Sequence, residues 1–307
     1  MKIFLSSTYK DLVRHREAAA QAIERLGQQG VRMEVFGARP DEASVACLGE
    51  IQDSDALVGI YAHRYGFIPQ SQTRSITEQE YDFAQEKEKP TFCFVVDEEY
   101  PWPPKSIEMG SGQQRLHEFI ERLRKKTVVD TFTTPEDLAY KVASSLGRFL
   151  LYLKVKDNLE KIPARELVST ALGRSQVARR AARSASVIRD AQLLMVNDVP
   201  EEMAQVTAIL VSLSMKVQVV TTTEAALDAL REGAFDVVIS DMRRGIVKDE
   251  GLRFLEKKRD FGLDVPVIFT VGQFNPALGT PPFAFGITNR VDELLNLLFD
   301  VLERTRG

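Results

Sequence analysis

The chain has 307 residues, a length typical of about two domains. Its formal net charge of -4, from 40 Lys and Arg against 44 Asp and Glu, excludes a general attraction to nucleic acid or anionic membranes. Apolar residues make up 44% and charged residues 27%, which excludes the disordered and fibrous classes. The two cysteines, Cys47 and Cys93, and the three scattered histidines exclude a disulfide framework and a structural zinc site.

The first half of the sequence alternates between short apolar runs and amphipathic segments. Because neither a signal sequence nor an apolar run of about 18 residues is present, we expect a cytoplasmic protein without a membrane span. Strands alternating with helices predict a parallel sheet covered on both faces, forming a first domain at residues 1–153. The expected strands are 2–6, 31–36, 56–61, 91–96 and 127–130, and the expected helices are 11–26, 43–52, 77–87, 114–125 and 135–153.

Residues 154–189 contain nine Lys or Arg, three Asp or Glu, and no strand pattern. We predict a basic helical linker here. Its run at 179–183 can contact phosphates, but a solvated helix face is the favoured interpretation because no aromatic residues are interleaved for base stacking.

A second alternation begins at residue 190 and continues to residue 307. Its strands are expected at 193–197, 216–220, 235–240, 266–270 and 283–287, and its helices at 200–213, 223–232, 251–260 and 291–303. This number and order of elements predict a flavodoxin-like doubly wound domain. The predicted fold class is therefore α/β, with two doubly wound parallel-sheet domains joined by a helical linker.

Four spaced motifs in the first domain carry a resemblance to a known family. They are FLSSTYKDLVRHREAA, MEVFGARPDEA, SDALVGIYAHRYGFIP and SITEQEYDFAQEKEKPTF, in this order. Together they resemble the family DUF4062, a divergent relative of Toll/interleukin-1 receptor (TIR) domains found in signalling proteins. The resemblance covers about residues 1–150 and implies a TIR-like fold.

Glu80 is the candidate catalytic residue of the first domain. The spacing of Glu80, Ala84 and Lys89 resembles that of NAD-cleaving TIR domains and nucleoside deoxyribosyltransferases, which implies NAD or a nucleotide as substrate. A carboxylate can stabilise the positive charge that develops on a ribose when its N-glycosidic bond breaks. The alternative is a structural role, since Thr77 and Glu80, or Ser75 and Glu78, have the spacing of a capping box.

Further polar residues follow the first and third expected strands, where ligands bind in open α/β sheets. The candidate ligand-binding residues are Ser6, Ser7, His63, Arg64 and Tyr65. His63 and Arg64 can hold a phosphate or a ribose, or can pack a rigid loop together with Tyr65. The serines can bind a ligand or cap the helix that begins near residue 11.

The second domain resembles the receiver domain of response regulators. The resemblance implies that Asp241 accepts a phosphoryl group, that Asp198, Asp241 and the Arg243 carbonyl hold Mg²⁺, and that Thr270 binds the phosphoryl oxygens. Hard oxygen ligands of this kind suit Mg²⁺. The resemblance also implies a histidine kinase or another signalling protein as partner, and a role for the receiver in dimerisation.

Three departures from the receiver pattern predict an altered output face. Asn197 replaces an acidic residue. No lysine follows Lys258, so Asn289 or Arg290 stands nearest to the phosphate-sensing lysine of the family. Residues 271–282 contain two glycines and three prolines, which predicts a missing or broken helix.

Two functions are compatible with this sequence. In the first, a TIR-like interaction domain is paired with a receiver-like regulatory domain. In the second, Glu80 is the centre of an NAD or nucleotide-sugar hydrolase or transferase controlled by the receiver. Because the receiver-like segment comes last in the sequence, we expect no role as a transcription factor.

Overall fold

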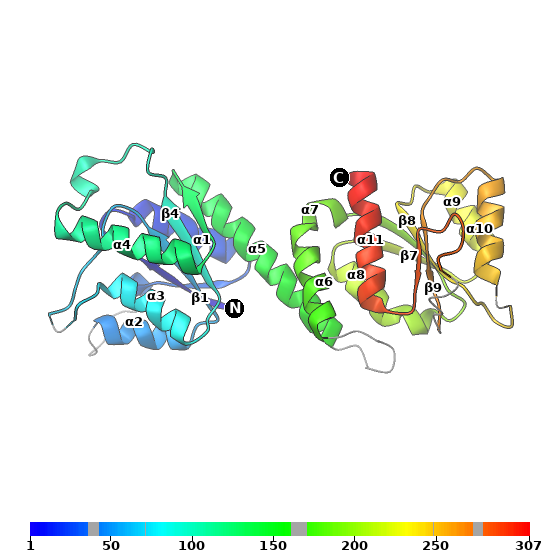
Figure 1. Cartoon of the computed structure of the whole chain (residues 1–307), viewed down its shortest axis with the longest axis horizontal. Helices are drawn as coiled ribbons and strands as arrows, with labels where there is room; N and C mark the ends of the chain where they lie inside the picture. The colour runs from blue at the N-terminus through cyan, green and yellow to red at the C-terminus, as the bar shows by residue number, and fades with distance from the viewer. Residues whose placement is uncertain (36–42, 71, 161–170, 248, 273–278) are drawn as a thin grey trace. The chain divides into compact units, whose positions relative to one another are not determined.

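The computed structural model describes residues 1–35, 43–70, 72–160, 171–247, 249–272 and 279–307. The chain divides into two compact units, Met1–Gly147 and Arg148–Gly307, here called the first unit and the second unit (Figure 1). None of the helices in these ranges is both long enough and apolar enough to cross a membrane.

The first unit is built on a parallel sheet with the strand order β2-β1-β3-β4-β5. This is the flavodoxin-like order, and it confirms the predicted fold class. Every position of β3 is buried, as expected for a central strand covered on both faces. The strands are β1 Lys2–Ser7, β2 Gln29–Val31, β3 Ala56–Tyr61, β4 Thr91–Val96 and β5 Val129–Phe132.

Helices cover both faces of this sheet. One face packs on α1 and the beginning of α5 through Ile23 and Val142, and the other packs on α2, α3 and α4 through Ile51, Tyr81 and Phe119. The helices are α1 Val13–Arg25, α2 Ala43–Gln52, α3 Ile76–Glu86, α4 Ser111–Lys126 and α5 Pro135–Glu160, with short 3₁₀ turns at Met33–Val35 and Pro104–Ser106.

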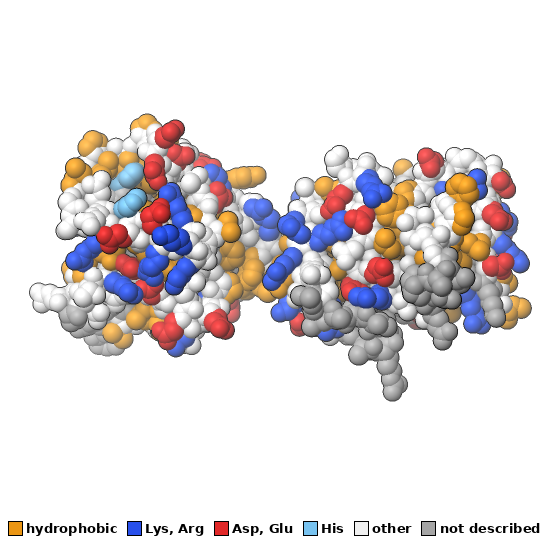
Figure 2. Space-filling view, viewed as in Figure 1, with side chains coloured by type: hydrophobic (Ala, Val, Ile, Leu, Met, Phe, Trp, Pro, Cys, Tyr) orange, Lys and Arg blue, Asp and Glu red, His pale blue; other side chains and the backbone are white. Residues whose placement is uncertain are grey.

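The second unit contains a second parallel sheet with the order β10-β9-β8-β6-β7, again the flavodoxin-like order. Its strands are β6 Gln192–Val196, β7 Lys216–Val220, β8 Val237–Asp241, β9 Val267–Thr270 and β10 Gly286–Thr288. Its helices after β6 are α8 Ala204–Ser212, preceded by a 3₁₀ turn at Pro200–Met203, then α9 Thr223–Glu232, α10 Glu250–Asp260 and α11 Val291–Arg306. Figure 2 shows acidic and basic side chains interspersed on the visible face of each unit.

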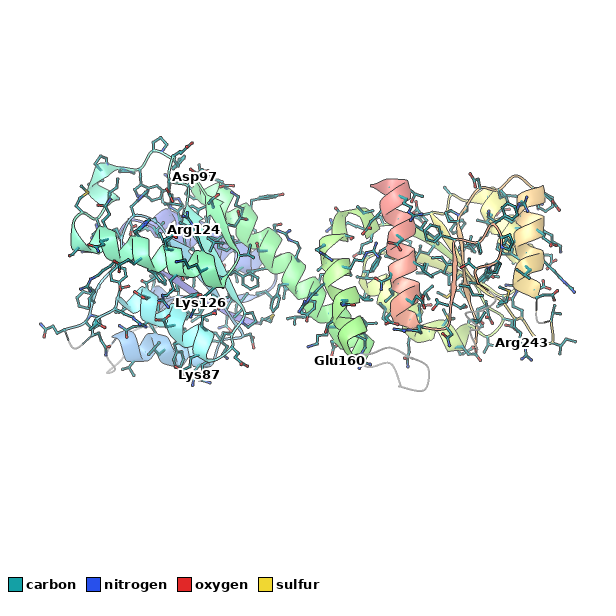
Figure 3. All side chains as sticks on the ribbon, in the orientation of Figure 1. Lys87, Asp97, Arg124, Lys126, Glu160 and Arg243 are labelled. Carbon is teal, nitrogen blue, oxygen red and sulfur yellow. The ribbon has the colours of Figure 1, made fainter. Side chains whose placement is uncertain are left out.

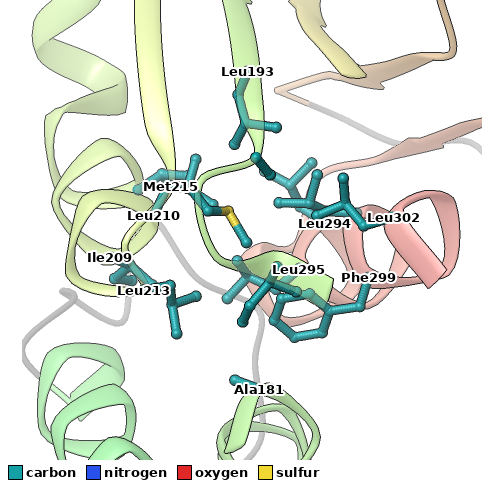
Figure 4. Close-up of a cluster of buried hydrophobic side chains, with 14 of the residues drawn as sticks. Ala181, Leu193, Ile209, Leu210, Leu213, Met215, Leu294, Leu295, Phe299 and Leu302 are labelled. Atoms are coloured by element: carbon teal, nitrogen blue, oxygen red, sulfur yellow. The ribbon is translucent and has the colours of Figure 1, made fainter. Parts of the chain in front are cut away.

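The described part of segment 154–189 packs into the second unit. It contains the end of α5, α6 Ala171–Arg183 and α7 Ala185–Ile188, and residues 161–170 lie outside the described ranges. Val155, Leu159, Val177 and Ala181 are fully buried in one cluster with α8 and α11, part of which is drawn in Figure 4. These helices therefore contribute to a hydrophobic core in addition to connecting two sheets.

Two strand predictions need correction. The second strand was expected at 31–36, but β2 ends at Val31 and a 3₁₀ turn follows at Met33–Val35. Only three residues of this edge strand pair with β1, and residue 36 lies outside the described ranges. The last strand was expected at 283–287, but Phe283 has a φ of 68°, which a strand residue cannot adopt, and β10 begins at Gly286. The expected break at 271–282 falls partly on residues 273–278, outside the described ranges.

We predict that Gly251→Ala destabilises the second unit, because a Cβ at this position would lie 2.8 Å from Phe269 and 3.1 Å from the carbonyl oxygen of Asp241. Overpacking of this kind lowers the free energy of unfolding by about 1–3 kcal/mol. Gly147→Ala is the matched control, since a Cβ there meets nothing within 4 Å in a helix interior, and alanine raises the helix propensity by about 1 kcal/mol. Thermal unfolding of both variants measures the effect. Changes in melting temperature of the same sign in the two variants would contradict this packing.

Candidate functional site

Glu80 lies on α3, beneath the carboxyl end of β1, and is 5% exposed. Its Oε2 accepts a hydrogen bond of 2.6 Å from the hydroxyl of Ser6, the sixth residue of the chain and part of β1. The Cys47 thiol of α2 also bonds to this carboxyl group. Three separate elements therefore fix the position of one buried acid.

Burial raises the pKa of Glu80 to about 7, against the opposing effects of the bonds from Ser6 and Cys47 and the charge of Arg16. Arg16 donates directly to other groups, through Nε to Glu34 at 2.7 Å and through Nη1 to Ser7 Oγ at 2.6 Å. Among the described residues, Glu80 thus has hydrogen-bond donors but no directly bonded cation, and its raised pKa lies near neutral pH.

Of the two expected capping frames of α3, the structure forms the N-cap of the Ser75–Glu78 frame and not the Thr77–Glu80 box. The N-cap of α3 is Ser75, whose hydroxyl accepts from the backbone N–H of Glu78 at 3.2 Å, so Thr77 does not form the capping box with Glu80. The helix α1 has Leu12 at its N-cap, without a side-chain bond, so the serines at the end of β1 do not cap it. Ser6 therefore bonds to Glu80 and does not act as a helix cap.

A cavity of about 620 Å³ adjoins Glu80, and we call it the Glu80 cavity. Three exposed apolar or aromatic side chains, Tyr9, Met33 and Phe67, contribute to its lining. Its charged lining residues are Lys10, Arg16, Arg64, Glu34, Glu80 and Glu108. The cavity combines apolar and ionic surface, as small-molecule sites do.

The structure places the other candidate ligand-binding residues at different depths. Ser7 and Arg64 line the Glu80 cavity. The ring of His63 instead packs against Trp102, with centroids 5.5 Å apart, and burial lowers its pKa. Tyr65 is buried, and its hydroxyl donates to Glu78, which also bonds to Arg122 at 2.5 Å. Neither His63 nor Tyr65 lines this cavity, so only Ser7 and Arg64 join Glu80 there.

The second unit brings its candidate residues to the carboxyl edge of its sheet. Asp241 ends β8, Thr270 ends β9, and the two are partners in the β-sheet register. Both line a pocket of about 410 Å³, here called the Asp241 pocket, which Asn197 also lines. The side chain of Asn197 is 4% exposed, and its Oδ1 accepts from the N–H of Val199 at 2.7 Å.

Asp198 and Asp241 lie close enough for their charges to interact. Burial and the charge of Asp198 raise the pKa of Asp241, although the N–H groups after it and Arg244 act in the opposite direction. One oxygen of Asp198 accepts from the N–H of Gly245 at 2.6 Å. The described residues contain no group of three or more His, Cys, Asp or Glu side chains arranged for a metal, so backbone carbonyls and water would complete an Mg²⁺ shell here.

Asn289 and Arg290, expected nearest to the place of the family's lysine, both line the Asp241 pocket. Arg290 donates to Asp292 at 2.6 Å, and the side chain of Arg243 is exposed and bonds to the carbonyl of Gly245 (labelled in Figure 3). Arg244, by contrast, is 6% exposed and donates to Ser240 Oγ at 2.8 Å and to the carbonyl oxygen of Asp241 at 3.0 Å. A buried arginine thus supports the backbone that carries Asp241.

Arg16 and Arg244 are the two residues that sequence reasoning missed. The position of Arg16 carried a detectable signal, because it shares the buried face of α1 with Ala19, Ala20 and Ile23, at helical spacings of three, four and seven. A charged residue in such a stripe needs a buried partner. Arg244 lies in a loop, where no periodicity reveals burial.

We predict that Glu80→Gln flattens the pH dependence of stability. Glu80 is harder to ionise in the folded chain than in the unfolded chain, so its protonated form stabilises the fold below about pH 4.5, and this contribution is lost as the pH rises through about 7. Chemical denaturation across this range would show a wild-type decline, relative to the variant, of up to about 3 kcal/mol.

Ser6→Ala is the matched control for this measurement, because the Ser6 hydroxyl lowers the pKa of Glu80. Removal of this hydroxyl should move the decline in the free energy of unfolding to higher pH. Parallel profiles for the wild type and Glu80→Gln would show that the carboxyl ionises in its ordinary range.

Among solved structures, the chain is similar to the chemotaxis response regulator CheY4 of Vibrio cholerae, with 23% identity over 36% of this chain and 98% of that one, and a TM-score of 0.31. It is similar to the response regulator TrrA of Thermotoga maritima in complex with Mg(2+)-BeF, with 19% identity over 36% and 98% and a TM-score of 0.32. A third is the receiver domain of an HD domain-containing protein from Pseudomonas fluorescens Pf-5, with 19% identity over 38% and 97% and a TM-score of 0.33.

The comparison with curated proteins gave no significant match. The family model described as a domain of unknown function, DUF4062, matches residues 2–147, which is nearly the whole first unit. Residues 2–147 of this chain are therefore a DUF4062 domain, as the four motifs predicted.

Proposed function

We propose that this chain is a signalling protein in which the second unit accepts a phosphoryl group at Asp241 and regulates the DUF4062 domain, acting as a TIR-like interaction domain. The observation that carries the proposal is the register pairing of Asp241 with Thr270 at the edge of a pocket that Asn197 also lines. Asp198, which raises the pKa of Asp241, supplies a second carboxylate nearby.

In the proposed reaction, an oxygen of Asp241 attacks the phosphorus of a donor such as a histidine kinase. The bond between phosphorus and the donor breaks, and its electron pair leaves with the donor. Asp241 and Asp198, with the Arg243 carbonyl, would hold Mg²⁺, whose charge favours the ionised carboxylates and neutralises the phosphoryl oxygens. The Thr270 hydroxyl would then donate to one of those oxygens.

Arg244 keeps the attacking residue in place during this step. Its guanidinium bonds to Ser240 and to the backbone of Asp241 on one side, and to Thr223 at 2.9 Å on the other. The three groups belong to β8 and to the start of α9, so the loop after β8 is tied to the sheet and to α9. Asp241 therefore meets a donor without a large loss of conformational freedom.

The test is incubation of the full chain with Mg²⁺ and acetyl phosphate, followed by intact mass measurement. We expect one added phosphoryl group on the wild type and none on Asp241→Asn. Asp236→Asn is the control, since Asp236 lies at the opposite, amino end of β8, where its carboxylate accepts from the N–H of Gln192. Absence of the adduct on the wild type, or its persistence in Asp241→Asn, would contradict the proposal.

A second candidate function is cleavage of an N-glycosidic bond in the first unit, with NAD or a nucleotide sugar as substrate. The observation that favours it is a buried carboxyl group with a pKa of about 7 next to a 620 Å³ cavity. When the bond between the base and the anomeric carbon breaks, the electron pair leaves with the base, and the ribose becomes positively charged. The ionised form of Glu80 would stabilise that charge until water adds to the same carbon.

We expect that Glu80→Gln lowers turnover of NAD or nucleosides by about 100-fold or more, because the amide cannot supply a negative charge. Chromatography of the released base measures the rate. Glu86→Gln is the control, since Glu86 lies on the same helix with a 69% exposed side chain. Equal rates for the wild type and Glu80→Gln would exclude a catalytic Glu80.

A further inference from the structure

The strongest unexplained feature of the first unit is the ion pair between Arg16 and Glu34. It is bidentate, with Arg16 Nε 2.7 Å from Oε1 and Nη2 2.5 Å from Oε2 of Glu34. The remaining nitrogen of Arg16, Nη1, donates to both the hydroxyl and the carbonyl oxygen of Ser7, at 2.6 and 3.2 Å. All three guanidinium nitrogens of Arg16 are therefore occupied.

The two partners differ sharply in exposure. The side chain of Arg16 is 4% exposed and belongs to the buried face of α1, whereas that of Glu34 is 31% exposed and projects from a single 3₁₀ turn. Burial opposes ionisation of Glu34, but the hydrogen bonds and charge of Arg16 outweigh it and lower its pKa. If Glu34 moves away from Arg16, water can solvate its carboxylate. The buried guanidinium of Arg16 cannot move into solvent in the same way. A buried arginine left without an anion is strongly destabilising, so Glu34 can leave only if another anion takes its place.

This ion pair also contributes to two cavities. Tyr9, Arg16 and Glu34 line the Glu80 cavity, and the same three residues line a second cavity of about 580 Å³, here called the outer cavity. The other basic residues of the outer cavity are Arg14 and Arg32. An anion on Arg16 would therefore be reachable from either cavity, and Lys10 and Arg64 line the Glu80 side.

We propose that Arg16 is the binding site for the phosphate group of an elongated small molecule that occupies both cavities, and that Glu34 holds this site until the ligand displaces it. A guanidinium presents the same planar fork to a phosphate as to a carboxylate. A phosphate has further oxygens beyond the two that replace the Glu34 carboxylate, and Lys10 and Arg64, which line the Glu80 cavity together with Arg16, supply positive charge on that side. This site depends on neither phosphoryl transfer to Asp241 nor catalysis by Glu80.

The test is calorimetric titration of the full chain with inorganic pyrophosphate at fixed ionic strength. The Asp241→Asn background and a chelator remove a contribution from the second unit. Glu34→Gln removes the competing charge, and we expect it to tighten pyrophosphate binding by about tenfold. Glu24→Gln is the control, because Glu24 lies on the same helix as Arg16 but is exposed and lines neither cavity. We expect Glu24→Gln to change the affinity by no more than about twofold, since exposed charges are screened by salt.

A third variant, Arg16→Lys, retains the charge but loses the fork, and we expect weaker binding. The melting temperature of Arg16→Lys shows whether this variant is folded. If it is not, the pyrophosphate affinity of Glu34→Gln still tests the proposal. The proposal is overturned if Glu34→Gln binds pyrophosphate no tighter than the wild type does, or if Glu24→Gln tightens binding equally. Malonate is the carboxylate probe, and malonate binding tighter than that of pyrophosphate would overturn the assignment to phosphate. Because neither Glu80 nor Asp241 is required here, a negative result leaves the two proposed functions to their own tests.

Discussion

Parallel strand pairing is the constraint on which both sites depend. In a parallel sheet covered on both faces, the strand interiors accept almost only apolar side chains, and polar side chains collect where the strands end. Register then decides which of them meet. Pairing of β8 with β9 puts Asp241 opposite Thr270, and pairing of β1 with β3 puts Ser6 opposite Gly59, on the side of the sheet where α3 presents Glu80. A shift of one residue in either pairing would separate these groups or turn them to the other face.

Two glutamates of α3, Glu78 and Glu80, lie in different environments. Glu78 is held by Arg122 and by the Tyr65 hydroxyl, and it belongs to an ionic network with α4. Glu80, two residues further along, faces the sheet, and within the described ranges its donors are neutral, namely Ser6 and Cys47. Glu78 thus belongs to an ionic network, whereas the carboxyl group of Glu80 is bonded to neutral donors, and burial raises its pKa to about 7.

The sequence predicted the order of elements well because long alternating patterns report burial directly. It predicted Asp241 and Thr270 correctly as strand ends, and it found Glu80 through a motif. It did not predict partners, because a partner depends on register and side-chain direction. Tyr65 follows β3 as expected, but its hydroxyl bonds to Glu78. Arg16 pairs with Glu34, which lies 18 residues further along the chain. Edge elements such as β2 and β10 were misplaced because three paired residues leave a weak pattern.

The helices α6 and α7 have a consequence for how this protein can be divided. The family resemblance of the second unit begins at about residue 190, where β6 starts, yet the hydrophobic core of that unit includes Val155, Leu159, Val177 and Ala181 upstream of it. A fragment cut at residue 190 would leave α8 and α11 with an uncovered apolar surface and would favour self-association. A stable fragment of the second unit would therefore have to begin before α6 and include the end of α5, so that α8 and α11 keep their covering helices.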